Sequence, residues 1–222
     1  MRICLTNGCE IENCEELVSE FYEKDAHGLY DRLEVPHNNE LDLVSLASLA
    51  FFERQNPELA HWRTLEKMKP IIEEKLGAIP PSVSITDSEI PWNELTDLFG
   101  KFLAVDGFAC ARVSKILHKK RPHLIPILDR ARVINAYYKP IVEQTIEEMH
   151  SKTDLPLAFL KQYALNLPIV MTALVKAIRT DILANRSVLE QIQGRLTKEG
   201  VLLSLVRIFD IILWEYAGRE AK

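Results

Sequence analysis

The sequence lacks the common motifs of nucleotide-binding proteins and hydrolases. It contains no Walker loop, no Rossmann glycine pattern, no Gly-x-Ser-x-Gly elbow and no His-Glu-x-x-His motif. Its four cysteines include no Cys-x-x-Cys pair. We therefore expect free thiols in a reducing cytoplasm rather than a zinc site, a disulfide framework or an iron–sulfur cluster. These absences argue against nucleotide-dependent and common hydrolytic chemistry, but they leave enzymes with other kinds of site open.

Long hydrophobic runs are also missing. The two most apolar segments, Leu165–Ile178 and Val201–Trp214, are interrupted by proline or by charged residues and fall short of the roughly 20 apolar residues that a bilayer-spanning helix needs. The first residues break at Gly8 and then turn acidic, without the apolar stretch of a signal peptide. We expect a cytoplasmic protein without membrane contact.

Alternation of apolar and polar residues, the pattern of a half-buried strand, does not persist for more than a few residues anywhere. Apolar residues instead recur at three- and four-residue steps, which is typical of helices with one buried face. The sequence therefore predicts an all-α fold with no sheet. The expected helices are Glu10–Lys24, Glu40–Arg54, Pro57–Leu76, Trp92–Val105, Ala109–His118, Asp129–Tyr138, Pro140–His150, Leu155–Leu165, Pro168–Asn185, Val188–Leu196 and Leu202–Ala217.

Length and composition favour one domain. The chain has 222 residues, of which 47% are hydrophobic and 27% charged, a balance that suits a globular protein with a sizeable core. We expect a single compact helical domain over residues 1–222, built as two lobes that share a core. The net charge of −5 means that any contact with nucleic acid must come from a local concentration of positive charge.

Such a concentration lies between Gly107 and Arg132, where seven Lys or Arg residues accompany one acid, Asp129. Gly107 suits a tight turn between two helices, and the N–H groups at the start of the second helix can bind phosphate without reading base sequence. We predict a DNA-binding surface here. Its members are Gly107, Ala109, Arg112, Lys115, Lys119, Lys120, Arg121 and Arg130. The alternative is a solvated basic face that binds nothing in particular.

Residues 103–129 resemble the hairpin and following segment of the helix-hairpin-helix DNA glycosylases. That superfamily has an apolar residue, a Gly-apolar-Gly turn, a helix that starts with small residues, and a Pro-apolar-Asp pattern about 22 residues after the first glycine. This chain has Gly107-Phe108-Ala109 and, at the matching distance, Pro126-Ile127-Leu128-Asp129. The resemblance implies an all-α, two-lobed fold with a helix-hairpin-helix-like core at about residues 91–138.

The same resemblance implies a catalytic role for Asp129. The acid at this place stabilises an oxocarbenium-like sugar and positions water during base excision. The chain departs from the pattern at several positions: the second glycine is Ala109, the lysine of the bifunctional lyases falls at Ala111, and the histidine beyond the acid is Ala131. A monofunctional glycosylase-like hydrolase is therefore the activity implied, without Schiff-base chemistry and without a cofactor. The alternative for Asp129 is structural, as the N-cap of the next helix.

A second resemblance covers most of the chain. The segment Ser114–Pro122, with Ile125-Pro126-Ile127, is similar to a bacterial domain family of unknown function. Tyr30-Asp31-Arg32-Leu33 and Arg207-Ile208-Phe209-Asp210 are also features of that family. This resemblance implies no activity.

Three further features have structural interpretations. Arg207 and Asp210 are three residues apart on an almost wholly apolar helix, so we expect a buried ion pair. The tryptophans occupy apolar positions that suit the core. Glu58-x-x-His61 and Glu147-x-x-His150 each match half of a di-iron carboxylate site, a coincidence that chance explains, and we expect no metal.

The prediction is thus a DNA-binding protein, with base excision at Asp129 as an extension. The alternative is a non-catalytic helical scaffold that contacts proteins, whose identity the sequence leaves open.

Overall fold

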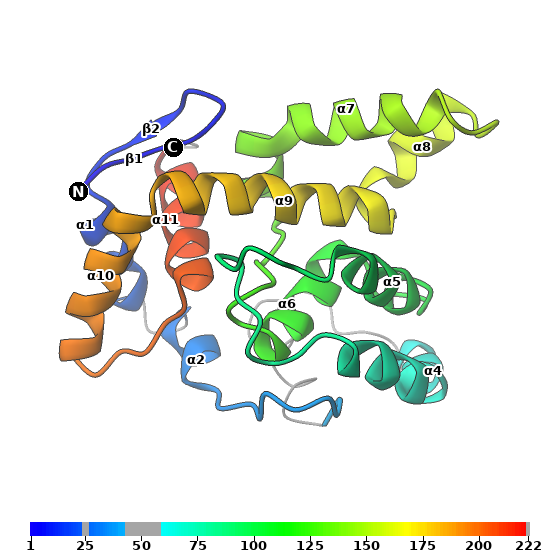
Figure 1. Ribbon diagram of the computed structural model, residues 1–222, viewed down its shortest axis with the longest axis horizontal. Helices are drawn as coiled ribbons and strands as arrows, with labels where there is room; N and C mark the ends of the chain where they lie inside the picture. Colours follow the sequence, from blue (N-terminus) through cyan, green and yellow to red (C-terminus); the bar gives the residue numbers. More distant parts are fainter. Residues whose placement is uncertain (24–26, 43–58, 221–222) are drawn as a thin grey trace.

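Helices make up nearly all of the regular structure in the computed structural model, which describes residues 1–23, 27–42 and 59–220 (Figure 1). The all-α class is therefore confirmed. The α-helices are α1 (Cys14–Glu23), α2 (His27–Arg32), α4 (Leu59–Gly77), α5 (Trp92–Leu103), α6 (Cys110–Lys120), α7 (Lys139–His150), α8 (Leu157–Tyr163), α9 (Pro168–Ala184), α10 (Arg186–Lys198) and α11 (Leu205–Glu220). A π-helix, η2 (Arg130–Tyr138), and a short 3-10 helix, η3 (Ala164–Asn166), complete them.

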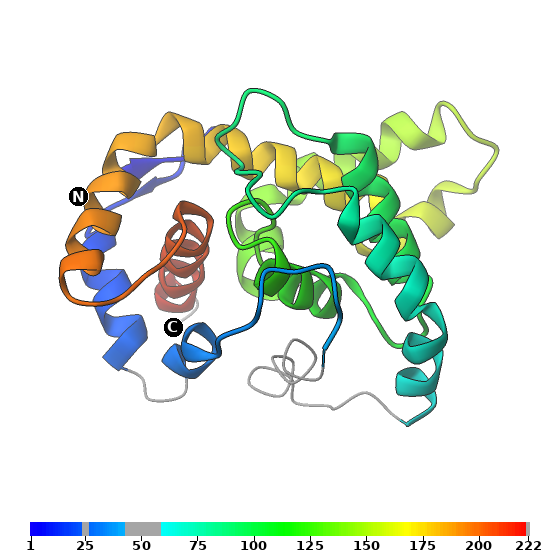
Figure 2. The same cartoon turned by 60° about the horizontal axis from the view of Figure 1, so that its bottom comes forward.

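Helix α9 runs through the middle of the molecule. It lies between α7 and α5, and α4 packs on the outer side of α5 (Figure 1). At the other end α11 is surrounded by α1, α10 and η2 (Figure 2). The buried apolar side chains of both ends, from Ile3 to Ala217, belong to one continuous cluster.

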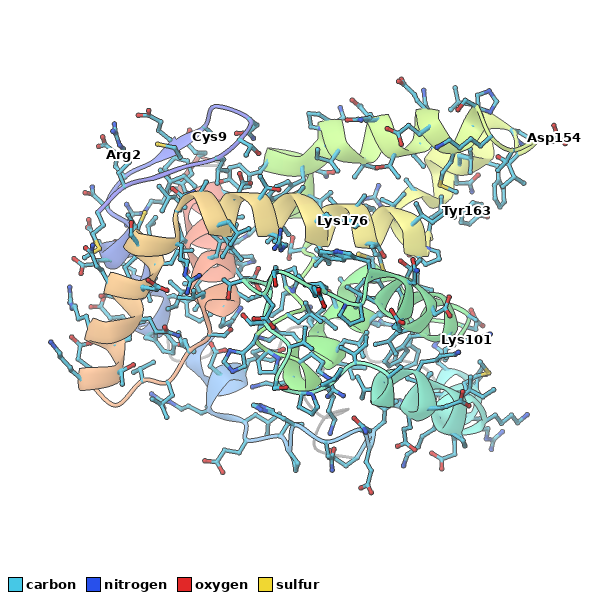
Figure 3. All side chains as sticks on the ribbon, viewed as in Figure 1. Arg2, Cys9, Lys101, Asp154, Tyr163 and Lys176 are labelled. Carbon is cyan, nitrogen blue, oxygen red and sulfur yellow. The ribbon has the colours of Figure 1, made fainter. Side chains whose placement is uncertain are left out.

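The stripes of apolar residues predicted for α1 and α5 face this core. Leu17 and Phe21 of α1 are buried, as are Leu98 and Phe102 of α5. Exposed charged residues such as Arg2, Lys101 and Asp154 lie at the periphery (Figure 3). No helix in the described part of the chain is both long and apolar enough to cross a membrane.

Two short strands correct the expectation that the chain has no sheet. Strand β1 (Ile3–Cys4) pairs antiparallel with β2 (Glu10–Ile11), and Ile3 lies opposite Ile11. Each strand has only two residues, too few to produce a recognisable alternation. Both isoleucines are fully buried, so the hairpin covers one end of the core.

One helix departs from the prediction. Helix α2 was not predicted, because its six residues are too few for a periodic pattern. Helix α4 continues across Pro70 without a break, although a proline inside a helical pattern commonly kinks or breaks a helix. The helix expected at Glu40–Arg54 lies largely outside the described residues, as does Glu58.

Candidate functional site

The predicted hairpin consists of α5, a turn through Asp106 and Gly107, and α6. Gly107 has a φ of +77°, in the left-handed region that residues with a side chain rarely adopt. A Cβ at this position would also run into the imidazole ring of His61. The expectation that Gly107 permits the turn is confirmed.

The start of α6 carries the exposed members of the predicted surface. Ala109 is exposed and Arg112 is half-buried. The first bond within the helix joins the N–H of Val113 to the carbonyl of Ala109, at 3.0 Å, so the N–H groups of the preceding turn lie outside the helical ladder. The Arg112 guanidinium donates to the carbonyl of Gly107 and thereby holds the turn closed.

Arg121 is fully buried instead of facing solvent. Its guanidinium donates to the carbonyls of Leu76 and Ile79, at 2.8 and 2.7 Å, and to Asn39 Oδ1 at 2.6 Å. Leu76 lies in the last turn of α4, and Ile79 lies two residues beyond its end. Burial lowers the pKa of Arg121 to about 10. The side chain therefore acts as an internal cap that joins α6 to α4.

Lys120 and Lys119 are buried as well, and both hold the connector that follows α2. Lys120 Nζ lies 3.1 Å from Asp42 Oδ2 and also donates to the carbonyl of Pro36. Lys119 Nζ donates to the carbonyl of Leu33 at 3.0 Å and lies 4.2 Å above the centre of the Tyr30 ring. Burial lowers the pKa of Lys119 to about 8.

The predicted basic face is therefore wrong for four of its members. Lys115, Lys119, Lys120 and Arg121 have relative exposures of 8%, 8%, 0% and 0%. The charge pattern identified a helix rich in cations. It could not show that the connector after α2 and the end of α4 cover these side chains of α6. Arg112 and Arg130 remain accessible.

The motif on α2 links the hairpin to the terminal helix. The Tyr30 hydroxyl donates to the backbone carbonyl of Lys115 at 2.8 Å. Asp31 accepts two hydrogen bonds from Arg207, at 2.7 and 3.0 Å. Although burial opposes it, the Asp31 carboxylate raises the pKa of Arg207 above its ordinary value. The expected Arg207–Asp210 pair is thus corrected: Arg207 binds Asp31.

The extended segment between α6 and η2 is held by side chains. His118 Nδ1 donates to the carbonyl of Ile125 at 2.7 Å, and Ser114 Oγ accepts from the N–H of Leu128 at 3.0 Å. Burial lowers the pKa of His118 to about 3, so this ring stays neutral. The segment ends at Asp129, whose position is therefore set by buried contacts on α6.

Asp129 is the N-cap of η2, as one of the two interpretations predicted. Its Oδ1 accepts the N–H of Arg132 at 2.8 Å, and its carbonyl accepts from Val133 and Ile134. The carboxylate is half-exposed. The π-helix that it begins is a rare conformation that occurs frequently at functional sites.

A cavity of about 110 Å³ lies beside Asp129, between α1, α6, η2 and α11. We name it the hairpin cavity. Its lining residues are Phe21, Lys115, Ile127, Asp129, Val133, Arg207, Asp210 and Trp214. The cavity thus combines two carboxyl groups with aromatic walls. Sequence analysis identified Asp129 but assigned Trp214 to the core and Asp210 to an ion pair.

Asp210 is buried, with 3% relative exposure. Its Oδ2 accepts the N–H of Ile127 at 2.9 Å, whereas Oδ1 has no hydrogen-bond partner among the described residues. Burial raises the pKa of Asp210 to about 7, while the Ile127 N–H and Arg207 oppose the rise. Near neutral pH a large fraction of Asp210 is therefore protonated.

Trp214 forms an aromatic wall of the cavity. The Arg132 guanidinium carbon lies 3.7 Å from the centre of the Trp214 ring, which meets the Phe21 ring edge to face at a centroid distance of 6.1 Å. The cation–π contact connects η2 to α11 next to Asp129.

A second, wider hollow of about 410 Å³ lies about one turn further along α6, shares Arg207 with the hairpin cavity and includes His37, His123 and Gln193 in its lining. Within the described ranges, no three His, Cys, Asp or Glu side chains gather to hold a metal ion.

The fold and site define a largely helical protein with a helical hairpin that turns at Gly107. Most of the cations of this hairpin are buried and bind other parts of the same chain. Its sequence matches, over residues 15–217, a family of unknown function (DUF6308), and the chain belongs to that family. No curated protein and no solved structure matches it.

Proposed function

We propose that this protein binds DNA through the α5–α6 hairpin and accepts one nucleobase in the hairpin cavity. The observation that carries the proposal is that Asp129 and Trp214 line the same cavity, at the end of the segment that follows the hairpin. A base must leave the duplex to enter such a cavity, and aromatic walls favour a flat ring. In this proposal the chain corresponds to a helix-hairpin-helix glycosylase, with helices α4 to α6 in one lobe and helices α1 and α11 in the other.

The DNA contacts in this proposal come from the accessible groups of the hairpin and its following segment. These are the turn at Gly107 and Ala109, the half-buried Arg112 and the exposed Arg130. Two phosphate contacts by cations correspond to a slope of about −2 in the logarithm of affinity against the logarithm of salt concentration. The six cations of the surface predicted from the sequence would give a slope of about −5.

The proposed reaction is hydrolysis of the bond between a base and its sugar. As the C1′–N bond breaks, the electron pair leaves with the base, and the Asp129 carboxylate stabilises the positive charge that develops on the sugar. Asp129 also accepts a proton from the water that attacks C1′, and the departing base takes up a proton. The products are the free base and an abasic sugar hydroxyl.

Fluorescence polarisation with duplex DNA across a salt series tests the DNA part. Arg130→Glu is expected to weaken binding at least fivefold and to flatten the salt slope by about one unit. Arg186→Glu is the matched control, because Arg186 is exposed on α10, away from the cavity, and should bind as the wild type does. Absence of binding at low salt, or equal losses in both variants, would overturn the proposal.

Chromatographic detection of released bases from duplexes with mismatched or damaged pyrimidines tests the chemistry. Asp129→Asn keeps an N-cap acceptor and should preserve folding while lowering release at least a hundredfold. Equal release by wild type and Asp129→Asn would remove Asp129 from the reaction.

A second candidate is a helical scaffold that does not bind nucleic acid. The observation that favours it is the internal use of Lys119, Lys120 and Arg121, whose charges hold the fold together. Failure to bind DNA at low salt, together with an unfolding defect in Arg121 variants, would support this candidate.

A further inference from the structure

The two oxygens of Asp210 have different surroundings, and the difference bears on which ligand the hairpin cavity takes. The ligand assigned to this cavity rests on the proposed function, because the cavity is the same one. Oδ2 is occupied as an acceptor of the Ile127 N–H, and Oδ1 has no partner in the described part of the chain although the side chain is buried and lines the cavity. A buried polar atom without a partner is unfavourable, so a ligand that forms a hydrogen bond with it gains affinity.

The proton of a neutral Asp210 belongs on Oδ1. Oδ2 already accepts a hydrogen bond from an N–H, and a protonated oxygen is the poorer acceptor. Burial favours the neutral acid, with the pKa of Asp210 raised to about 7. The group therefore offers an O–H donor beside a cavity in which the Asp129 carboxylate is an acceptor.

The size of the cavity limits the ligand. An engineered cavity of roughly 150 Å³ binds benzene, so a space of about 110 Å³ favours one six-membered ring over two fused rings. Phe21 and Trp214 provide aromatic walls for such a ring.

We infer that the hairpin cavity binds a pyrimidine-class ring and that Asp210 recognises it by donating a hydrogen bond from Oδ1 to a ring carbonyl or ring nitrogen. Asp210 is a binding and specificity residue in this account, and Asp129 keeps the chemical role. A purine, with two fused rings, fits this volume less well.

Several charged or titratable groups surround Asp210, and any of them that changed charge between pH 6 and 8 would also alter ligand binding. Arg207 on the same helix is paired with Asp31, which α2 contributes, and Tyr30 lies next to that pair. Lys115 of α6 and Asp129 line the same cavity, and Tyr138 of η2 interacts electrostatically with Asp210. Burial raises the pKa of both tyrosines well above the ordinary value, so neither changes charge between pH 6 and 8.

The test is an NMR titration of the full chain with free uracil at pH 6 and pH 8. The wild type is expected to bind about tenfold more weakly at pH 8, because a group with a pKa of about 7 loses its proton over this range. Asp210→Asn keeps an acceptor for the Ile127 N–H and offers an N–H donor at all pH values. It is expected to bind uracil with the same dissociation constant at both pH values. Asp210→Ala should lose binding.

Three results would overturn the inference. They are uracil binding by the wild type that does not change with pH, binding of adenine as tight as that of uracil, and no uracil binding at millimolar concentration. Loss of uracil binding with DNA binding retained sinks this inference alone. Uracil binding with the expected pH dependence, in a protein that fails to bind DNA, supports the inference and overturns only the DNA part of the proposed function.

Discussion

Replacing Arg121 with methionine tests the conclusion that the cations of the hairpin hold the fold. Methionine keeps much of the length of the side chain but provides no donor, so the buried carbonyls of Ile79 and Lys120 lose the hydrogen bonds that Arg121 donates. Each buried acceptor left without a partner costs about 1–3 kcal/mol, and relief of the desolvated charge offsets part of the sum. We expect the free energy of unfolding to fall by about 3–5 kcal/mol.

Urea unfolding followed by circular dichroism measures this loss. For a chain of this size, a decrease of 3–5 kcal/mol also lowers Tm by about 6–20 °C. Arg121→Lys keeps the charge without the planar fork and should fall between the wild type and Arg121→Met. The matched control is Arg186→Met, which removes an exposed side chain paired only with Glu190 among the described residues and should cost about 0.5 kcal/mol.

The reasoning would be refuted by a loss below about 1 kcal/mol in Arg121→Met, equal to that of the control. It would also fail if Arg121→Met kept its stability and lost DNA affinity, because the guanidinium would then be a phosphate ligand.

Three further predictions follow from single contacts. Gly107→Ala should destabilise the protein by about 2 kcal/mol, measured by urea unfolding, because of its positive φ and the clash with His61, and His61→Ala should recover only the steric part. Asp31→Asn should cost about 3–5 kcal/mol by leaving Arg207 buried without its ion pair, whereas adding Arg207→Met should cost little more, a result that a double-mutant cycle measures. The folded-state pKa of Asp210, about 7, exceeds the ordinary 3.8, so its contribution to stability is complete below pH 4 and is lost as pH rises to 7. At pH 8 the free energy of unfolding of Asp210→Asn, measured with urea, should therefore exceed that of the wild type by about 2–4 kcal/mol. The difference should vanish near pH 4, and a difference that stays constant with pH would contradict the assigned titration.

Periodicity predicted most helices because each buries a stripe of apolar residues, as Leu98 and Phe102 do on α5. The turn at Gly107 and the cap at Asp129 were predictable because both depend on local backbone chemistry. Strand β1 was not, since its two residues carry no period.

The fate of the charged side chains could not be predicted, because it depends on contacts far apart in sequence. Arg121 meets the end of α4 some 42 residues earlier, and Arg207 meets Asp31 across 176 residues. The spacing of Arg207 and Asp210 identified two buried charges but suggested the wrong pairing. Arg207 pairs with Asp31 of α2, an element without a periodic signal, whereas Asp210 accepts the Ile127 N–H and lines the cavity.

The most direct test of the proposed base-binding site uses the three tryptophan indole N–H signals. In a ¹⁵N-labelled protein, Trp214 reports on the hairpin cavity, Trp62 on the hairpin through its contact with Phe108, and Trp92 on the distant start of α5. Titration with a duplex that contains an unpaired thymine should shift the Trp214 signal and leave Trp92 unchanged, and a fully paired duplex should shift Trp214 much less. A Trp214 signal that stays in place at saturating DNA would contradict the claim that the cavity receives a base.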